Sequence, residues 1–329
     1  MSRYYKIVVG ESPSSANKGF TWTNQIFGQA DLGAQKVEFD IWQSGEDEPV
    51  GAGYVKIWGP EKQQMLQSSD FNGAPIQVFV GMQPGLPFAT AAFNGGQQGL
   101  VSSGIIFQAF GNWQGVNQTL DFVIVPTSGD TQSNPANMSF MWKKGQPLSE
   151  AINSVLTIAY PTFESPKINI DPNLVLSQDE PFQYSTMTQF ASYLRGISKD
   201  IVGGDYNGVV IAQEGSQWIV FDGTQPTENP AIPIKAQDLI GQPTWLTPST
   251  VNFTTVMRAD LRIGSAITFP PTAALNAITT AQSQSFVRDK NAFAGTWQVS
   301  KIRHVGNSRD PNATSWVTVI DAYSNTAPA

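Results

Sequence analysis

The first third of the chain alternates apolar and polar residues, and this pattern restricts its fold more than any other feature. Val37, Phe39 and Ile41 point to one side of an extended backbone. Glu38 and Asp40, which lie between them, point to the other side. A period of two residues is typical of a β-strand with one buried face, and short strands separated by turns predict a barrel or a sandwich. The other elements predicted in this part are strands over 52–58, 75–80, 104–110 and 119–125 and a short helix over 60–66.

The middle of the chain changes to a helical period. Apolar residues recur from Leu148 to Ala159 at intervals of three and four residues, which predicts an amphipathic helix. Thr186 and Gln189 form a capping-box pattern, so a second helix is predicted to begin there. The two helices and a hairpin indicate a small α+β unit. Its other predicted ranges are a linker over 126–136, the second helix over 187–199 and hairpin strands over 207–213 and 217–222.

The last part of the chain returns to strand-like patterns. The predicted strands cover 251–257, 261–263, 266–269, 296–305 and 315–323, and 272–281 is either a short helix or a loop. The order is therefore β, α+β, β, and the predicted fold is mainly β with an α+β insert. We predict three domains: an N-terminal β-barrel domain over 1–130, a middle α+β domain over 131–235 and a C-terminal β-barrel domain over 236–329.

Charged and metal-binding residue types are scarce in this chain. Only 14% of its 329 residues are charged, against roughly 25% in an ordinary soluble domain. It contains no cysteine and one histidine, which excludes disulfides, thiolate zinc sites, cysteine nucleophiles and multi-histidine metal sites. The net charge is −7, and no block of Lys or Arg offers a surface for phosphates. An acidic surface instead suits a passage along which DNA slides, because like charges repel.

The residues that could carry catalysis have simpler structural interpretations. His304 lies in a predicted strand and the chain has no Gly-x-Ser-x-Gly elbow, so we interpret this histidine as hydrogen-bonded at a strand edge. Two acidic clusters could provide the paired carboxylates of glycoside hydrolysis: residues 46–48, and Asp179 with Glu180. Both lie in turn-like sequence, so we interpret them as solvated charges. The glycine-rich stretch 93–99 reads as a hairpin loop. We therefore expect no catalytic, cofactor-binding or metal-binding residues and no cofactor.

Aromatic residues and apolar runs narrow the functional classes further. Five of the tryptophans lie in strand-like segments, where burial in a core or interface is a better interpretation than stacking on a sugar: Trp42, Trp58, Trp218, Trp297 and Trp316. A carbohydrate-binding or carbohydrate-cleaving surface module nevertheless remains an alternative. No apolar run approaches the roughly 18 residues of a membrane span, and the apolar part of residues 1–10 is too short for a signal peptide. We expect no membrane segment.

Three stretches together resemble the baseplate hub proteins of contractile-tailed bacteriophages. The first is Pro75 to Met82 followed by Gly104 to Ile106, the second is Phe140 to Ser149, and the third is Asp238 to Trp245 with Val256 to Gly264 and the closing strands. None of these stretches is a catalytic signature. The resemblance lies in the type of sequence pattern and in the order of the patterns, and it covers essentially the whole length of the chain. Related hubs with fused enzymatic modules are longer, and this chain leaves no room for such a module.

The resemblance implies a structural role in a virion. Such hubs are homotrimers in which each subunit contributes two barrels similar to tail-tube subunits, so three copies match a six-fold tube. Their partners are the tail tube protein, the trimeric spike protein, and tape measure and baseplate wedge proteins, with DNA only passing through the lumen. The implied location is the tail baseplate, after assembly in the cytoplasm of the bacterial host. A tail-tube or secretion-system tube component is an alternative, although a simple tube subunit needs only one barrel.

Overall fold

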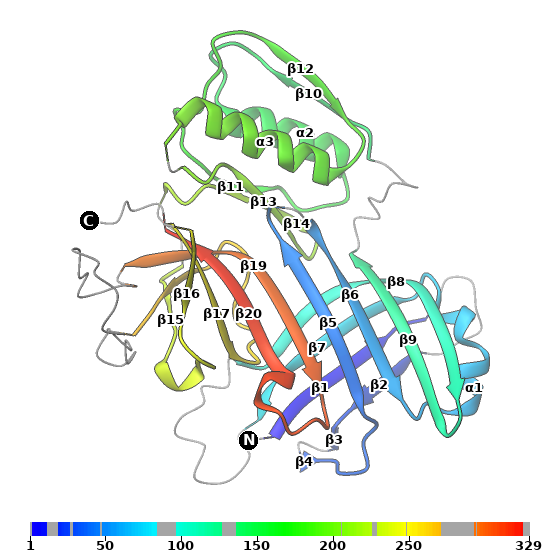
Figure 1. Cartoon of the computed structure of the whole chain (residues 1–329). Helices are drawn as coiled ribbons and strands as arrows, with labels where there is room; N and C mark the ends of the chain where they lie inside the picture. Colours follow the sequence, from blue (N-terminus) through cyan, green and yellow to red (C-terminus); the bar gives the residue numbers. More distant parts are fainter. Residues whose placement is uncertain are drawn as a thin grey trace.

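The computed structural model of the chain describes residues 2–11, 19–26, 29–46, 48–83, 97–126, 136–204, 206–225, 229–247, 249–270, 293 and 295–324. Within these ranges the protein is mainly β with a small helical insert, which confirms the predicted fold class (Figure 1). Most of the predicted linker (127–135), part of the glycine-rich loop (93–96) and the segment 272–281 lie outside the described residues.

The N-terminal part forms strands wherever the alternation predicts them, and most are longer than predicted. Its elements are β1 (Ser2–Val9), β2 (Phe20–Thr23), β3 (Gln25–Ile26), β4 (Gln29–Ala30), β5 (Val37–Ser44), β6 (Glu48–Trp58), α1 (Lys62–Leu66), the 3-10 helix η1 (Ser68–Phe71), β7 (Pro75–Gln83), β8 (Gly99–Gln114) and β9 (Asn117–Pro126). Strand β8 is long because its two halves have different partners. Residues 99–105 pair with β7, and residues 104–114 pair with β9.

This change of partner folds the sheet over an apolar core. Strands β7, β1 and β2 continue the sheet behind β5, β6 and β9, so that apolar side chains from both halves meet. Trp22 on β2 and Phe122 on β9 lie across this interior with ring centroids 5.9 Å apart, and Phe71 contacts both. We call this cluster the first core; it includes Ile7, Trp22, Phe39, Phe71, Val78, Leu120 and Phe122.

The insert places two helices between two small sheets. Its elements are β10 (Met138–Trp142), α2 (Leu148–Ala159), β11 (Lys167–Asn169), β12 (Glu180–Tyr184), α3 (Met187–Val202), β13 (Val210–Glu214) and β14 (Gln217–Phe221). Helix α2 has the predicted bounds, and α3 begins at its predicted cap, where the Thr186 hydroxyl accepts from the Gln189 N–H at 3.4 Å. Figure 1 shows β10 and β12 on one side of the helices and β11, β13 and β14 on the other. The second core lies between these layers and includes Phe140, Trp142, Leu148, Ile152, Phe190, Leu194 and Trp218.

Residues 209–212, which lead into β13 and form its first three positions, are apolar without interruption because both faces of the strand are covered there. Ile211 packs into the second core beneath the helices. Val210 and Ala212 point the other way, into a third core that belongs mainly to the C-terminal strands. A strand buried on both faces has no reason to alternate, which is why this run is apolar at consecutive positions. The insert therefore rests directly on the C-terminal part of the molecule.

The C-terminal part supplies the rest of the third core. Its elements are β15 (Ile232–Pro233), the 3-10 helix η3 (Ala236–Asp238), β16 (Thr244–Thr247), β17 (Thr250–Val256), β18 (Ala266–Thr268), β19 (Thr296–Asn307), the 3-10 helix η4 (Ala313–Ser315) and β20 (Trp316–Tyr323). The third core includes Val210, Phe253, Leu261, Ile267, Trp297, Val299 and Ile320. The strand predicted over 261–263 is wrong. Leu261 and Ile263 are buried, but the chain there enters a turn in which Gly264 donates to the Val299 carbonyl at 2.8 Å.

The two β parts of the chain share one sheet. Strand β19 lies between β20 and β5, and His304 is opposite Ile41 in the β5 pairing. In the described residues this gives a 13-stranded sheet whose main path runs from β16 through β19, β5 and β8 to β2. The pairing of β5 with β19 links segments that no short-range pattern connects. The domain boundaries at 130 and 235 stay a prediction.

Candidate functional site at the junction of the three cores

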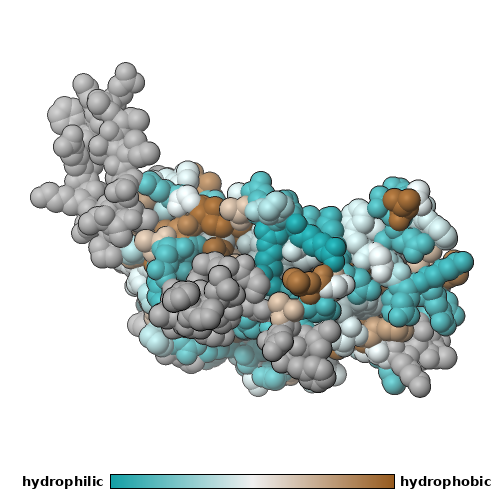
Figure 2. Space-filling view, turned by 90° about the horizontal axis from the view of Figure 1, so that it is seen from below, coloured by the Kyte–Doolittle hydropathy of each residue, from teal (hydrophilic) through white to brown (hydrophobic). Residues whose placement is uncertain are grey.

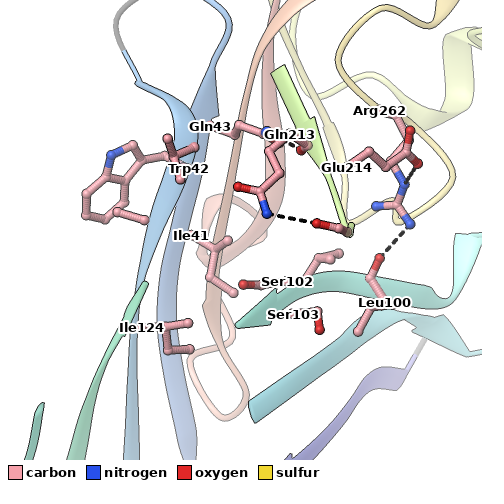
Figure 3. Close-up of a pocket in the computed structure, with 15 residues that line it drawn as sticks. Ile41, Trp42, Gln43, Leu100, Ser102, Ser103, Ile124, Gln213, Glu214 and Arg262 are labelled. Atoms are coloured by element: carbon pink, nitrogen blue, oxygen red, sulfur yellow. Dashed lines mark hydrogen bonds and ion pairs between the residues drawn. The ribbon is translucent and has the colours of Figure 1, made fainter. Parts of the chain in front are cut away.

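The turn between β5 and β6 brings the N-terminal sheet against the insert. Gln43 Nε2 donates to the carbonyl oxygen of Gln213 at 2.6 Å (Figure 3). It also donates to the carbonyl oxygen of Pro49 at 3.1 Å. Next along the chain, Glu46 accepts a salt bridge from Arg195 on α3 at 2.9 Å. The end of β5 and the turn that follows it thus bind two elements of the insert, strand β13 and helix α3.

Arg262 connects all three parts of the molecule. It belongs to the C-terminal segment that follows β17, and its Nε lies 3.2 Å from a carboxylate oxygen of Glu214 in the insert. Its Nη2 donates to the carbonyl oxygen of Leu100 on β8 at 2.8 Å. Figure 3 shows this guanidinium between the two partners. The sequence analysis did not single out Arg262, and no local pattern marks it.

A cleft of about 240 Å³ lies between these contacts. Its polar lining comes from Gln43, Ser102, Ser103, Gln213, Glu214 and Arg262. The volume is below the roughly 300 Å³ at which small-molecule sites begin. The Glu214 carboxylate pairs with Arg262, so it is not poised as a base for either serine. The geometry suits a seam that fixes the parts of the molecule relative to one another.

Gly45 allows the turn to approach the insert closely. A Cβ built at this position would lie 2.1 Å from Cγ1 of Val210 on β13. We expect Gly45→Ala to lower the free energy of unfolding by about 1–3 kcal/mol, because added atoms at a packed contact force neighbours out of position. Urea unfolding followed by tryptophan fluorescence measures this change.

Gly196 on α3 provides the matched control for that substitution. It has no atom within 4 Å of a built Cβ, and alanine favours a helix interior over glycine by about 1 kcal/mol. Gly196→Ala should therefore stabilise the protein. A Gly45→Ala variant as stable as the wild type would contradict the close contact, and Val210→Ala in its background should restore part of the loss.

His304 is buried in the centre of the sheet rather than at its edge. Strand β19 is paired on both sides at this position, so the predicted edge location is wrong. The predicted hydrogen bond is present, because Nδ1 lies 3.1 Å from the hydroxyl of Thr318. Burial, with a smaller contribution from Arg262, lowers the pKa of His304 to about 3. The imidazole is therefore neutral at pH 7 and part of the packing.

The acids of the two clusters whose side chains the structure describes each have a separate partner. Glu46 is held by Arg195, Asp47 lies outside the described residues, and Glu48 begins β6. Asp179 accepts from the backbone N–H of Lys144 at 2.7 Å. Glu180 accepts from the hydroxyl of Tyr193 at 2.9 Å, and burial together with this carboxylate raises the pKa of that tyrosine. These acids hold local structure.

The described ranges contain no group of three or more His, Asp or Glu residues that could hold a metal ion. In the same part of the chain, no helix is long and apolar enough to cross a bilayer. Of the five tryptophans named above, Trp218, Trp297 and Trp316 are buried in cores, and Trp42 and Trp58 are half-buried. Trp58 lies under the ammonium of Lys36, which is 4.4 Å from the ring centroid.

The outward face of the sheet carries charges that pair across neighbouring strands. Arg303 on β19 donates to both carboxylate oxygens of Asp40 on β5, at 2.8 and 2.6 Å. Lys56 on β6 lies 3.3 Å from Asp121 on β9. Cross-strand pairs of opposite charge stabilise a sheet modestly. They also leave these basic groups already engaged.

Comparison with known proteins finds similarity at the level of structure. No protein-family profile matches the sequence, and no curated protein matches it. Two tail proteins are among the solved structures that match over nearly the whole chain. One is the 43 kDa tail protein of prophage MuSo2 from Shewanella oneidensis, with a TM-score of 0.51, 9% identity and coverage of 99% of both chains. The other is a tail protein from Neisseria meningitidis MC58, with a TM-score of 0.53, 9% identity and coverage of 99% of this chain and 98% of that one.

This likeness extends through all three cores and the junction between them. At 9% identity it shows a shared fold. The chain therefore has the fold of these two tail proteins. The β, α+β, β order predicted from periodicity is the order of the elements in this chain.

Proposed function

We propose that this protein is a structural component of a phage-type tail. Its role would be that of the trimeric baseplate hub, which adapts the six-fold tail tube to the three-fold central spike and encloses a channel for DNA. The observation that carries the proposal is the likeness of fold to two tail proteins over 99% of the chain. The role is structural, and the junction cleft fits it because Gln43 and Arg262 beside it bind groups from other parts of the chain.

In this proposal, the β segments 1–130 and 236–329 are the two tube-like barrels, and 131–235 is an outer domain. Three copies would then present six barrel positions to a six-fold tube. Two features support this arrangement. The first and third cores lie in the two β segments, and the β5–β19 pairing makes them parts of one sheet. The contacts of Arg262 and Gln43 hold the insert in a fixed place on that sheet.

The charges of the sheet suit a surface that DNA passes without binding. A protein that grips DNA neutralises phosphates with free Lys and Arg. Here Arg303 and Lys56 are engaged by Asp40 and Asp121, and the whole chain carries a net charge of −7. We propose that this face lines the lumen. The proposed partners are the tail tube, spike, tape measure and wedge proteins, and the proposed location is the virion baseplate after cytoplasmic assembly.

Two other functions fit fewer of the observations. A tail-tube or secretion-system tube subunit needs only one barrel, whereas this chain has two β segments and an insert with its own core. A carbohydrate-binding module needs exposed aromatic platforms, and three of the five tryptophans in strand-like segments, Trp218, Trp297 and Trp316, are buried, although Trp113 and Trp245 are exposed. The hub explains the largest share of the structure.

The oligomeric state of the purified full chain tests the hub proposal. Sedimentation velocity should give a trimer, and negative-stain images should show a three-fold ring with an opening. A second measurement is co-sedimentation with the tube and spike proteins of the same tail. A hexameric ring or a tube would favour the tube subunit instead. A chain that stays monomeric at every concentration and binds neither protein would refute the hub.

A further inference from the structure

Two uncharged surfaces lie at opposite ends of the molecule, one at the tip of the β8–β9 hairpin and one at β16, where the path of the main sheet begins. The β8–β9 hairpin at one end belongs to residues 104–126, which contain one charged residue, the buried Asp121. At the other end, β16 and β17 belong to residues 239–257, which contain none. In a chain of net charge −7, uncharged stretches of this length are suited to contact rather than to solvation. Figure 1 shows the hairpin and β16 far apart.

The hairpin end exposes large apolar side chains. Val116 at the turn is 96% exposed, and Trp113 beside it is 56% exposed. Phe107 and Phe110 on β8 and Leu66 on the adjoining α1 are exposed as well. Figure 2 shows hydrophobic spots near this end among mostly hydrophilic and neutral surface. The centre of a protein–protein interface is typically rich in aromatic residues and poor in charged ones, as this surface is.

The opposite end has the same character and an open strand edge. All four residues of β16 are exposed, with Leu246 at 56%. In the described part of the chain, β16 pairs with β17 alone, so its other edge presents backbone groups without a strand partner. The second half of β8 also has one edge without a strand partner among the described strands. Its Ala109 N–H is taken by the side chain of Asn72, and from Gly111 to Gln114 it pairs, among the described strands, only with β9.

We propose that the hairpin end of one copy packs against the β16 end of a second copy of this chain. The surfaces differ from one another, so the contact is head-to-tail and closes into a ring when the rotation permits. The net charge selects this occupant. A different protein that the net charge of −7 attracts would be basic, and it would dock on acidic residues. Two copies of this chain carry the same negative charge and repel each other, so they must meet on surfaces without charged side chains. The proposal rests on the proposed hub function and adds the surfaces that would build the trimer.

Charge placed on either surface tests the contact. Val116→Asp and Leu246→Asp should each convert the trimer to monomers in sedimentation velocity, with at least a tenfold rise in the dissociation constant. Leu32→Asp is the matched control, because Leu32 is 95% exposed but lies in the loop between β4 and β5. It should leave the trimer intact. All three positions are exposed, so melting temperatures near that of the wild type should show that each variant folds.

A mixing experiment separates head-to-tail from symmetric contact. Val116→Asp retains an intact β16 end, and Leu246→Asp retains an intact hairpin end. An equimolar mixture at high concentration should therefore form a dimer and nothing larger. Dimerisation of either variant alone through its intact surface would overturn the head-to-tail contact. Trimers of both variants, with a trimeric wild type, would overturn this inference and leave the hub standing. A monomeric wild type would overturn the trimeric hub itself, and the inference with it.

Discussion

Replacing Arg258 by methionine is expected to lower the free energy of unfolding by about 3–5 kcal/mol, because it leaves the buried Asp238 and the half-buried Asp260 without their counter-ion. The Arg258 side chain is 5% exposed. Its Nε and Nη2 donate to the two oxygens of Asp260 at 2.9 and 2.6 Å, and its Nη1 lies 3.5 Å from Asp238. Asp238 is also buried, and its second carboxylate oxygen has no hydrogen-bond partner. The guanidinium therefore supplies the counter-charge inside this part of the protein.

Urea unfolding of the Arg258→Met variant measures this loss. Arg258→Lys keeps the charge but not the planar fork that binds Asp260, so it should fall between the wild type and Arg258→Met. Adding Asp238→Asn and Asp260→Asn to Arg258→Met should recover much of the stability, because no charge is then left buried. A loss below about 1 kcal/mol for Arg258→Met would mean that the ion cluster is solvated, as surface pairs are.

Replacing Asp121 by alanine should cost about 3 kcal/mol at neutral pH, because several donors lose a charged acceptor together. Asn112 and Thr119 donate to one oxygen of this buried carboxylate at 2.6 and 2.9 Å. The hydroxyl of Tyr54 donates to the other oxygen, and Lys56 lies 3.3 Å from it. The cluster joins β6, β8 and β9 on the outward face of the sheet.

The stability that Asp121 contributes should depend on pH in a defined direction. Burial raises the pKa of its carboxyl, but the hydrogen bonds from Tyr54, Asn112 and Thr119 and the charge of Lys56 outweigh burial and hold the pKa below 3.8. The contribution is therefore complete above the unfolded value and is lost as the pH falls through the folded one. Wild type and Asp121→Ala should differ most in urea unfolding near neutral pH, and the difference should shrink as the pH falls through the lowered folded pKa of Asp121.

Asp40 serves as the control for Asp121. It lies on the same face and also pairs with a base, Arg303, but this pair is partly exposed. Asp40→Asn should cost roughly 0–1 kcal/mol, because water screens such a pair. Equal losses at Asp40 and Asp121 would show that burial does not set the difference. A constant loss for Asp121→Ala across pH would contradict the lowered pKa.

Local periodicity predicted the elements that depend on local contacts. The apolar spacing of Leu148 to Ala159 matches α2 to the residue, because one helix face must reach the second core. The alternation at Val37 to Ile41 matches β5, because one face of this strand must pack into the first core. The wrong strand over 261–263 shows the limit of the method. Leu261 and Ile263 are apolar because they enter the third core, and a turn can deliver them there as well as a strand.

Pairings between distant segments were not predictable from the sequence. Nothing near Arg303 indicates that its partner is Asp40, 263 positions away. His304 was expected at a strand edge because the sequence does not say that β5 covers the other side of β19. The junction contacts of Arg262 were missed for the same reason, since their partners lie in two other parts of the chain.

The sequence by itself determined the class of this protein: strand, helix and strand regions in a fixed order, without the residues for thiol or multi-histidine metal chemistry. Those properties follow from composition and from periods of two to four residues, which any short window contains. The tertiary structure alone decided that both β regions share one sheet, that Arg262 binds across the junction and that Arg258 is buried with two acids. These contacts depend on which faces of the strands and helices pack together in the folded protein. The free energy of that packing comes from residues that are far apart in the chain.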